Sequence, residues 1–407
     1  MTPEFPTALR RAALPDGSGL VDVRLHDGHV TDVAPAAGAA GTGELDLDGA
    51  LLMTAGAEPH THLDKALVYD RLRPAYGDLL SGIRQWQAHA ADLAEEDFVG
   101  RASTLARMFV ANGVTAVRTH AEIFPSGDPL RCVRALARVR AQLERVLDLQ
   151  VVVLPKGDID DAMIEAALDA GADLVGGSPH TAAEPDAELD RLLAIARRRR
   201  VGIDIHADER LDPTSLTMWR MARAIRHEPL APGATAMAGH CVSLGLLDAA
   251  ALAAVADDLR AAGVSVAAAP LTNLYLQAKD VATGPVPRAI APVRALLEAG
   301  VAVCGAGDNV RDPLNPLGAA DHLVTAGLLV AASHVTIEQA HAAVTDDARA
   351  AMGLEAAGAE PGRAADLLAI RAPSLAAAVA GGPYDRLVLR RGRVVSERRI
   401  SERTVAR

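Results

Sequence analysis

The feature that most constrains the fold of this chain is a pattern that recurs between about residues 51 and 310. A short apolar run, a turn with Gly, Pro or polar residues, and an Ala- and Leu-rich amphipathic stretch follow one another repeatedly. This alternation is typical of βα units, in which buried parallel strands are apolar along their whole length. The runs that qualify as strands are LLMTAGAEP, VTAVRTH, LQVVVLP, DLVGGSP, VGIDIHA, TAMAGHC, VSVAAAP and VAVCGAG. Eight such strands favour an α/β fold of the (β/α)8 TIM-barrel type over a doubly wound sheet.

The two ends of the chain have a different pattern. Residues 1–53 and 365–407 contain Gly-punctuated stretches of alternating hydrophobicity, such as GLVDVRLHDGHV and YDRLVLRRGRVV. Such stretches are typical of antiparallel strands and hairpins. We therefore expect both termini to combine into one small β-sandwich domain beside a barrel domain of residues 54–364. The longest insertion, residues 63–100, follows the first barrel strand and is long enough to act as a lid.

Composition and charge narrow the classes of function. The net charge is -11 at pH 7 and aromatic residues make up only 2% of the chain, which argues against a nucleic-acid binder because phosphates attract basic surfaces and bases stack on aromatic rings. The sequence has no run of roughly 18 apolar residues and no secretory signal pattern. Its three cysteines cannot form a disulfide framework. We expect a cytoplasmic homo-oligomer that acts on a small molecule and does not bind membranes.

Polar residues cluster at the carboxyl ends of the predicted strands, where the active sites of TIM barrels lie. They are His60 and His62 on the first strand, His120 on the second, His206 and Glu209 at the fifth, His240 on the sixth, and Asp308 and Asn309 at the eighth. Residues two apart on a strand share a face, so His60 and His62 can bind the same ion. Three imidazoles and one carboxylate suit Zn²⁺ or Fe²⁺ and leave a position for water. The pattern therefore predicts a catalytic metal site.

Several of these stretches resemble a known family. They are PHTHLDK (59–65), VRTHAE (117–122), HADE (206–209), GHC (239–241), PLTNLYLQ (270–277) and GDNVRDPLNPLG (307–318). They are similar to the amidohydrolase superfamily, and within it to the cytosine-deaminase-like family, most of whose members deaminate or hydrolyse a C–N bond of a small nitrogen heterocycle. The resemblance implies that one divalent metal is bound by four residues: His60, His62, His206 and Asp308. It also implies that Glu209 and His240 act in proton transfer.

The chemistry of these residue types supports the same roles. A divalent metal lowers the pKa of a bound water from about 15.7 to about 7, which provides hydroxide as the nucleophile at neutral pH. A carboxyl group such as Glu209 in a semi-buried pocket can protonate a ring nitrogen and pass a proton to the leaving amine. His240 can donate to the developing oxyanion, and Asp308 can be both ligand and proton acceptor. The superfamily's binuclear members carry a bridging lysine on strand 4, which this chain lacks, so we expect one metal, Zn²⁺ or Fe²⁺.

Departures from the family pattern concern the substrate. The cytosine deaminases that this chain resembles carry glutamine at the position of Lys156, aspartate at that of Asn309 and tryptophan at that of Leu314. Lys65 and the Asp308-Asn309 pair are instead similar to the N-isopropylammelide amidohydrolases, which lack the glutamate of the HADE motif. We predict that Lys156, Asn309 and Lys65 bind the substrate. An ammonium group only donates hydrogen bonds, so the substrate should present more acceptors than cytosine does.

The sequence thus predicts a metal-dependent hydrolytic deaminase that releases ammonia from a small amino-substituted nitrogen heterocycle. Two alternatives stay open at this point. The first is an amidohydrolase that cleaves a cyclic amide or an N-substituted amine of a heterocycle. The second, from a different class, is a non-catalytic or regulatory protein that keeps the barrel fold.

Overall fold

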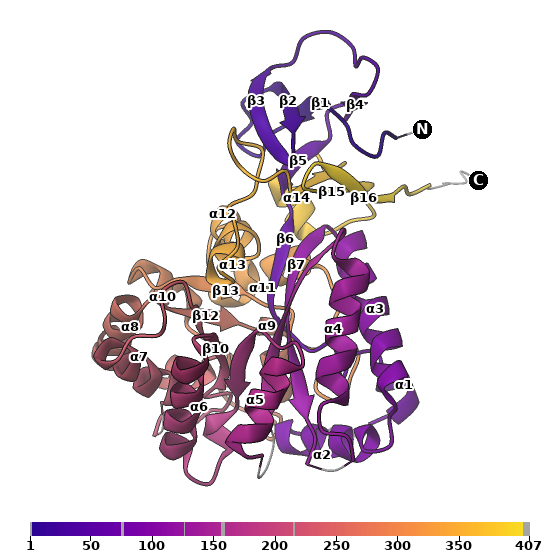
Figure 1. Cartoon of the computed structure of the whole chain (residues 1–407). Coiled ribbons are helices and arrows are strands. Elements are labelled where there is room, and N and C mark those ends of the chain that lie inside the picture. Colours follow the sequence, from indigo (N-terminus) through magenta and orange to yellow (C-terminus); the bar gives the residue numbers. More distant parts are fainter. Residues whose placement is uncertain (1, 75–76, 126, 156–158, 215, 402–407) are drawn as a thin grey trace, which may run out of the picture.

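A barrel of parallel strands forms the centre of the computed structural model, which describes residues 2–74, 77–125, 127–155, 159–214 and 216–401 (Figure 1). The eight strands pair in chain order: β6 (Gly56–Thr61), β7 (Val114–Ile123), β8 (Asp148–Pro155), β9 (Leu174–Gly177), β10 (Gly202–Ala207), β11 (Ala236–His240), β12 (Val264–Ala268) and β13 (Val303–Gly305). A parallel bridge between Thr61 and Asp308 joins the two ends of this sheet. The predicted barrel is confirmed.

Helices and short 3-10 turns connect the strands and lie outside them (Figure 1). The helices are α1 (Tyr69–Leu72), α2 (Leu79–Ala90), α3 (Glu95–Ala111), α4 (Arg131–Leu143), α5 (Asp161–Asp169), α6 (Pro185–Arg199), α7 (Thr217–His227), α8 (Ala249–Ala262), α9 (Pro270–Leu276), α10 (Val293–Glu298), α11 (His322–Ser333), α12 (Ile337–Ala343) and α13 (Asp346–Ala351), with 3-10 turns at Pro179–Thr181 and Val242–Leu246. Helix α4 shows why they dock: Cys132, Leu136, Val139 and Leu143 recur every three or four residues and are all buried. Within the described ranges, no helix is both long and apolar enough to cross a bilayer.

Strands from both termini form a second sheet, as the sequence predicts. The strands are β1 (Ala8–Ala13), β2 (Leu20–His26), β3 (His29–Pro35), β4 (Leu45–Asp46), β5 (Leu51–Thr54), β14 (Leu367–Ile370), β15 (Arg386–Arg390) and β16 (Arg393–Arg398), with helix α14 (Leu375–Ala380) after β14. Strand β14 pairs antiparallel with β5, which joins the two ends of the chain. This sheet has a hydrophobic core of its own, which includes Leu9, Val23, Leu52, Leu367 and Leu389. The exact boundaries of the two domains, 1–53 with 365–407 and 54–364, stay a prediction.

The first predicted barrel strand, LLMTAGAEP, is divided in the structure. Leu51–Thr54 is β5 of the terminal sheet, and the barrel strand β6 begins only at Gly56. At the change of sheet, Ala55 donates its N–H to Asp366 and Gly56 donates its N–H to Gly113. A side chain at Gly56 would lie 2.5 Å from the His322 ring, so only glycine fits there. The prediction of one strand was wrong because both halves are buried and apolar, and hydrophobicity cannot tell which sheet each half joins.

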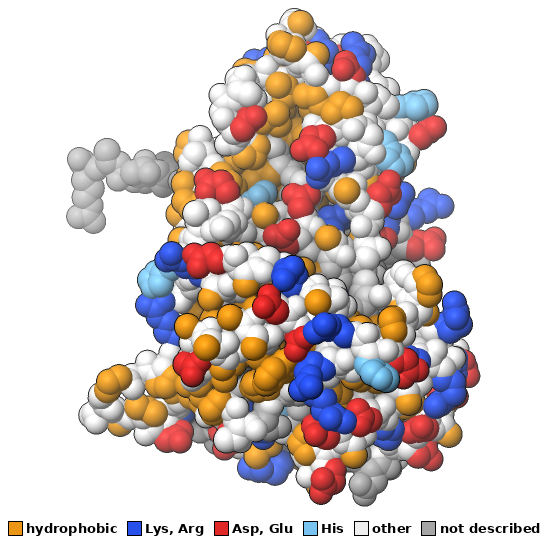
Figure 2. Space-filling model, turned by 90° about the vertical axis from the view of Figure 1, so that its left-hand side faces the viewer, with side chains coloured by type: hydrophobic (Ala, Val, Ile, Leu, Met, Phe, Trp, Pro, Cys, Tyr) orange, Lys and Arg blue, Asp and Glu red, His pale blue; other side chains and the backbone are white. Residues whose placement is uncertain are grey.

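Charged side chains of both signs are interspersed over the face shown in Figure 2. The basic run at the end of α6 illustrates this mixing. Arg197 pairs with Glu228, Arg198 with Glu165, and Arg199 with Asp169. These arginines also lie in the last turn of the helix, where the helix dipole favours cations. The arginines at the end of α6 are therefore explained by their position in the helix and by the carboxylates that neutralise their charges.

A buried histidine behind β6 makes the stability of the fold depend on pH. Burial lowers the pKa of His322 to about 3 and that of the nearby His341 to about 4. Neither ring nitrogen of His322 has a hydrogen-bond partner among the described residues. Below the ordinary pKa of 6.5, the unfolded chain takes up protons that the folded chain does not. The free energy of unfolding must therefore fall as the pH drops from about 6.5 towards 3.

We predict that His322→Leu reduces this loss of stability, by at most about 1.4 kcal/mol per pH unit. The measurement is the free energy of unfolding in urea at several pH values between 7 and 4. The control is His26→Leu, because the His26 side chain is 76% exposed. An unchanged pH dependence in His322→Leu would show that this ring takes up its proton in the folded state.

Candidate metal centre and active site

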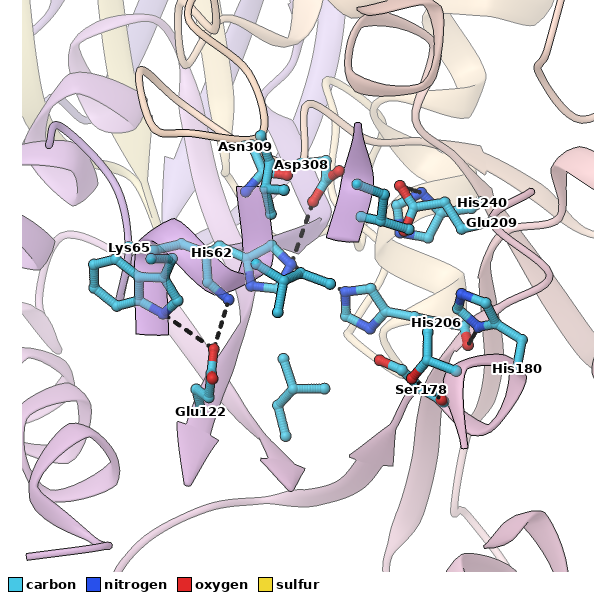
Figure 3. A pocket seen from close by; sticks show the side chains of 16 residues that line it. His62, Lys65, Glu122, Ser178, His180, His206, Glu209, His240, Asp308 and Asn309 are labelled. Atoms are coloured by element: carbon cyan, nitrogen blue, oxygen red, sulfur yellow. Dashed lines mark hydrogen bonds and ion pairs between the residues drawn. The ribbon is translucent and has the colours of Figure 1, made fainter. Parts of the chain in front are cut away.

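A pocket opens at the carboxyl ends of the barrel strands (Figure 3). It has about 470 Å³ of space not filled by atoms, a volume that includes space open to solvent. The residues that line it and that the sequence singles out are His62, Lys65, His206, Glu209, His240, Asp308, Asn309 and Leu314. Leu79, Ile83 and Trp86 of α2 supply an apolar wall, and Glu122, Ser178 and His180 add polar groups. Lys156 lies outside the described residues. The structure thus brings candidate residues from four predicted strands, the first, fifth, sixth and eighth, into one cavity.

Four side chains form a buried cluster that fits a divalent metal. His62 Nε2 lies 3.0 Å from His206 Nε2 and 3.4 Å from Asp308 Oδ1. One ligand atom from each of His60, His62 and His206 lies within 4.8 Å of the others. His60 Nε2 is buried without a hydrogen-bond partner among the described residues. Because buried polar atoms are rarely left unpaired, these nitrogens and the carboxylate are best satisfied by a shared cation.

Burial sets the protonation state that such a cluster needs. Desolvation is the main cause that lowers the pKa of His62, His206 and His240 well below the ordinary value. These imidazoles are therefore neutral at pH 7, and a neutral imidazole has a lone pair for a metal. Burial also raises the pKa of Asp308 to about 6, and a bound cation would favour its ionised form.

The backbone at the strand ends is bent to aim these side chains. His240, Asp308 and Asp208 have positive φ values of 68°, 58° and 51°, a conformation that costs free energy in non-glycine residues and is common at functional sites. Gly239 precedes His240, and a side chain there would lie 2.7 Å from the His60 ring. Asp208 points away from the pocket and accepts hydrogen bonds from the Thr217 N–H and hydroxyl at the start of α7. Asp208 thus anchors the loop that carries Glu209.

Glu209 and His240 form a pair on one side of the pocket (Figure 3). Glu209 Oε1 lies 3.5 Å from His240 Nδ1. Asn273 of α9 donates through Nδ2 to Glu209 Oε1 at 3.3 Å, and the same nitrogen lies 3.0 Å from His240 Nδ1. One turn further, Gln277 donates to the Glu209 carbonyl at 3.0 Å. The PLTNLYLQ stretch therefore holds the pair in place, a role that the sequence alone did not predict.

Lys65 lies in the pocket wall and is held by carboxylates (Figure 3). Its Nζ is 3.2 Å from Glu122 Oε2 and 3.7 Å from Asp64 Oδ2. Burial opposes the charge of Lys65, but the Asp64 and Glu122 carboxylates outweigh it and raise its pKa. Trp86 Nε1 and Gln87 Nε2 donate to the two oxygens of Glu122 at 3.0 and 3.1 Å. Glu122 thus connects α2 to the barrel. The sequence analysis did not single it out, and the one feature that could have done so is its position two residues after His120.

Asn309 and Leu314 lie on the loop that follows β13. Asn309 Nδ2 donates to Asp312 Oδ2 at 2.7 Å. Asp312 also accepts the N–H of Leu314 at 2.8 Å. Leu314 packs against Gly82 of α2, where a side chain would lie 2.5 Å from the leucine methyl group. Asn309, a predicted substrate-binding residue, and Leu314 therefore both border the pocket, and the loop is packed against α2.

Comparisons with known proteins place this geometry among enzymes. The amidohydrolase family matches residues 84–396. The chain is 29% identical over 394 residues to a pterin deaminase of Rhizobium rhizogenes, a match that covers 94% of this chain and 89% of that protein. The structure of 5-methylcytosine deaminase from Klebsiella pneumoniae with 5-fluorocytosine superposes with a TM-score of 0.88 at 28% identity, over 98% of this chain and 99% of that one. N-isopropylammelide isopropylaminohydrolase from Burkholderia multivorans gives 0.80 at 28% identity, over 96% and 98%.

Proposed function

The chain belongs to the amidohydrolase family, and we propose that this hydrolase of carbon–nitrogen bonds deaminates a small amino- and oxo-substituted heterocycle. The observation that carries the proposal is the meeting, in one buried pocket, of a His and Asp cluster with the Glu209–His240 pair. A regulatory barrel without activity would have no reason to keep both. The cytoplasmic location and the homo-oligomeric state that the sequence suggests stay predictions, which fractionation and sedimentation would check.

One divalent metal, Zn²⁺ or Fe²⁺, is the cofactor that we propose. His60, His62, His206 and Asp308 would hold it, because their ligand atoms are close together, buried and of the types that these metals prefer. A metal bound there supplies Lewis-acid polarisation and activates a water molecule at neutral pH. The segment after β9, which reads Ser178-Pro179-His180, has no lysine that could bridge a second metal.

The protein's own groups then move the protons. Asp308 accepts a proton from the attacking water on one carboxylate oxygen. Glu209 gives a proton to a ring nitrogen of the substrate, takes up the second proton of the attacking water, and passes it to the leaving amine, which departs as ammonia. The proton held by Asp308 then returns to Glu209, which restores both groups. His240 Nε2, which has no hydrogen-bond partner among the described residues, donates to the oxyanion that develops at the attacked carbon. Asn273 holds the Glu209 carboxylate and the His240 ring next to each other.

The substrate that we favour is a pterin or a related amino-oxo heterocycle. The pterin deaminase relative matches over nearly the whole of this chain. An apolar wall from Leu79, Ile83 and Trp86 suits a flat ring, and polar groups such as Asn309 and Ser178 can read its edge. The second candidate is removal of an N-alkyl amine, because the N-isopropylammelide hydrolase is similar over 96% of the chain and the same apolar wall would accept an alkyl group.

We predict that the purified protein holds close to one equivalent of Zn or Fe and that chelation abolishes its activity. The reason is that the four proposed ligands would make up a single site. Metal content measured by mass spectrometry, alongside activity during re-addition of metal, tests this. Full activity only at two equivalents would contradict the mononuclear site.

We predict that Glu209→Gln retains its metal and fold but loses on the order of 10²–10⁴ in kcat, because glutamine is nearly isosteric and cannot carry the proton. Steady-state kinetics on the best substrate and metal analysis are the measurements. A matched control is Glu228→Gln, whose carboxylate is exposed and paired with Arg197. Near-normal turnover by Glu209→Gln would assign the proton transfer to another group.

We predict weak turnover of cytosine and better turnover of heterocycles rich in acceptors. The panel should include pterins, oxo-triazines, N-alkylamino triazines, oxo-purines and pyrimidine carboxylates, with ammonia and alkylamine release both measured. The double substitution of Lys156→Gln and Asn309→Asp should shift the preference towards cytosine, because it restores the groups of the cytosine deaminases that the chain resembles. If cytosine has the highest kcat/KM for the wild type, the specificity argument is wrong.

A further inference from the structure

A polar layer lies inside the barrel beneath the proposed metal ligands. It consists of Arg118 and His120 of β7, Asp204 of β10 and the inner side of His60, and each of these residues is 0% exposed. The interior of such barrels is normally filled by apolar side chains. A buried ion pair is weak evidence for stability, because desolvation offsets the attraction between the charges. A contribution to stability therefore does not explain this polar layer, and we look for a role in function.

Asp204 is the centre of this layer. Its Oδ1 lies 3.3 Å from His60 Nδ1 and 3.5 Å from His120 Nε2. Its Oδ2 lies 3.2 Å from Arg118 Nη1. Arg118 in turn donates to Gln150 Oε1 at 2.8 Å and to Thr235 Oγ1 at 3.3 Å. The carboxylate is thus held across the barrel by side chains of β6 and β7.

These contacts bear on which nitrogen of His60 carries the proton. A neutral imidazole has one N–H and one lone pair, and only the lone pair can bind a metal. An ionised carboxylate can only accept, so Asp204 favours the form of His60 with the proton on Nδ1. His120 favours the opposite form, because its Nε2 lies 3.0 Å from His60 Nδ1 and could donate to it. That donation would move the His60 proton to Nε2, the nitrogen in the ligand cluster.

We propose that Asp204, held by Arg118, is a positioning residue that keeps the proton of His60 on Nδ1 and leaves the Nε2 lone pair for the metal. This inference rests on the ligand set proposed above. The atoms of His60, His120 and Asp204 are also close enough to hold a second cation. The Arg118 guanidinium, 3.2 Å from Asp204, argues against it because it places a positive charge at that spot.

The test is the metal affinity of the full-length apo protein, measured by competition with a chromophoric chelator. Asp204→Asn should raise the Kd for Zn²⁺ by about 10- to 100-fold, the usual effect of losing a hydrogen-bond partner of a metal ligand. The asparagine amide can donate as well as accept, so it no longer selects one form of His60. The control is Asp366→Asn, which also removes a buried carboxylate paired with an arginine, Arg349, and should leave the Kd unchanged.

A second variant keeps the test valid if Asp204→Asn misfolds, since that substitution leaves the Arg118 charge unpaired. The double substitution Arg118→Met with Asp204→Asn removes both charges and should fold, and it should show the same weakened metal binding. An unchanged Kd in either folded variant would overturn the inference. So would two equivalents of metal in the wild type, one of which is lost in His120→Phe.

His60→Ala separates this inference from the proposed ligand set. If His60→Ala binds metal like the wild type, the ligand set is wrong. If His60→Ala loses the metal while the Asp204 variants bind it normally, the ligand set stands and only the role of Asp204 is wrong.

Discussion

The closure of the barrel is the constraint on which the rest of the site depends. Strand β13 meets β6 where the Asp308 N–H donates to the His60 carbonyl at 3.2 Å and Thr61 donates its hydroxyl to the Asp308 carbonyl at 2.5 Å. These bonds join the last strand of the barrel to the first. They therefore set the Asp308 carboxylate beside His60 of β6 and His62, which follows directly after β6. Without this contact the ligands would remain at opposite edges of an open sheet.

The same closure creates an interior in which polar groups must satisfy one another. The side chains at the strand ends are buried, so imidazoles there stay neutral and carboxylates must be paired or coordinated. The polar side chains inside the barrel form two layers. The outer layer faces the pocket and leaves lone pairs for a cation, and the inner layer of Arg118 and Asp204 is neutralised within itself. The burial of apolar side chains from the surrounding strands and helices offsets the cost of burying these polar groups.

Rigid and adaptable parts of the site come from different elements. The proposed metal ligands lie on or directly after strands, whose positions the barrel determines. The pocket walls that would face a substrate come from α2, the 3-10 turn Pro179–Thr181 and the loop after β13, which are connecting segments. Connections vary more readily than strands, which agrees with relatives of one fold that bear the names of different heterocycles. Glu122 and Leu314 matter here because they connect α2 to the barrel and to that loop.

The sequence by itself determined the barrel, the joining of both termini in one small β domain and the residues at the strand ends. Apolar periodicity and the spacing of His60 and His62 are local properties, so they are visible in the sequence itself. The tertiary structure alone decided that the run at Leu51–Thr54 leaves the barrel, that Lys65 is paired with Glu122, and that Asp204 stands behind His60. Each of these depends on which strand or helix lies opposite. Such pairings join residues far apart in the chain, so no pattern within a single segment reveals them.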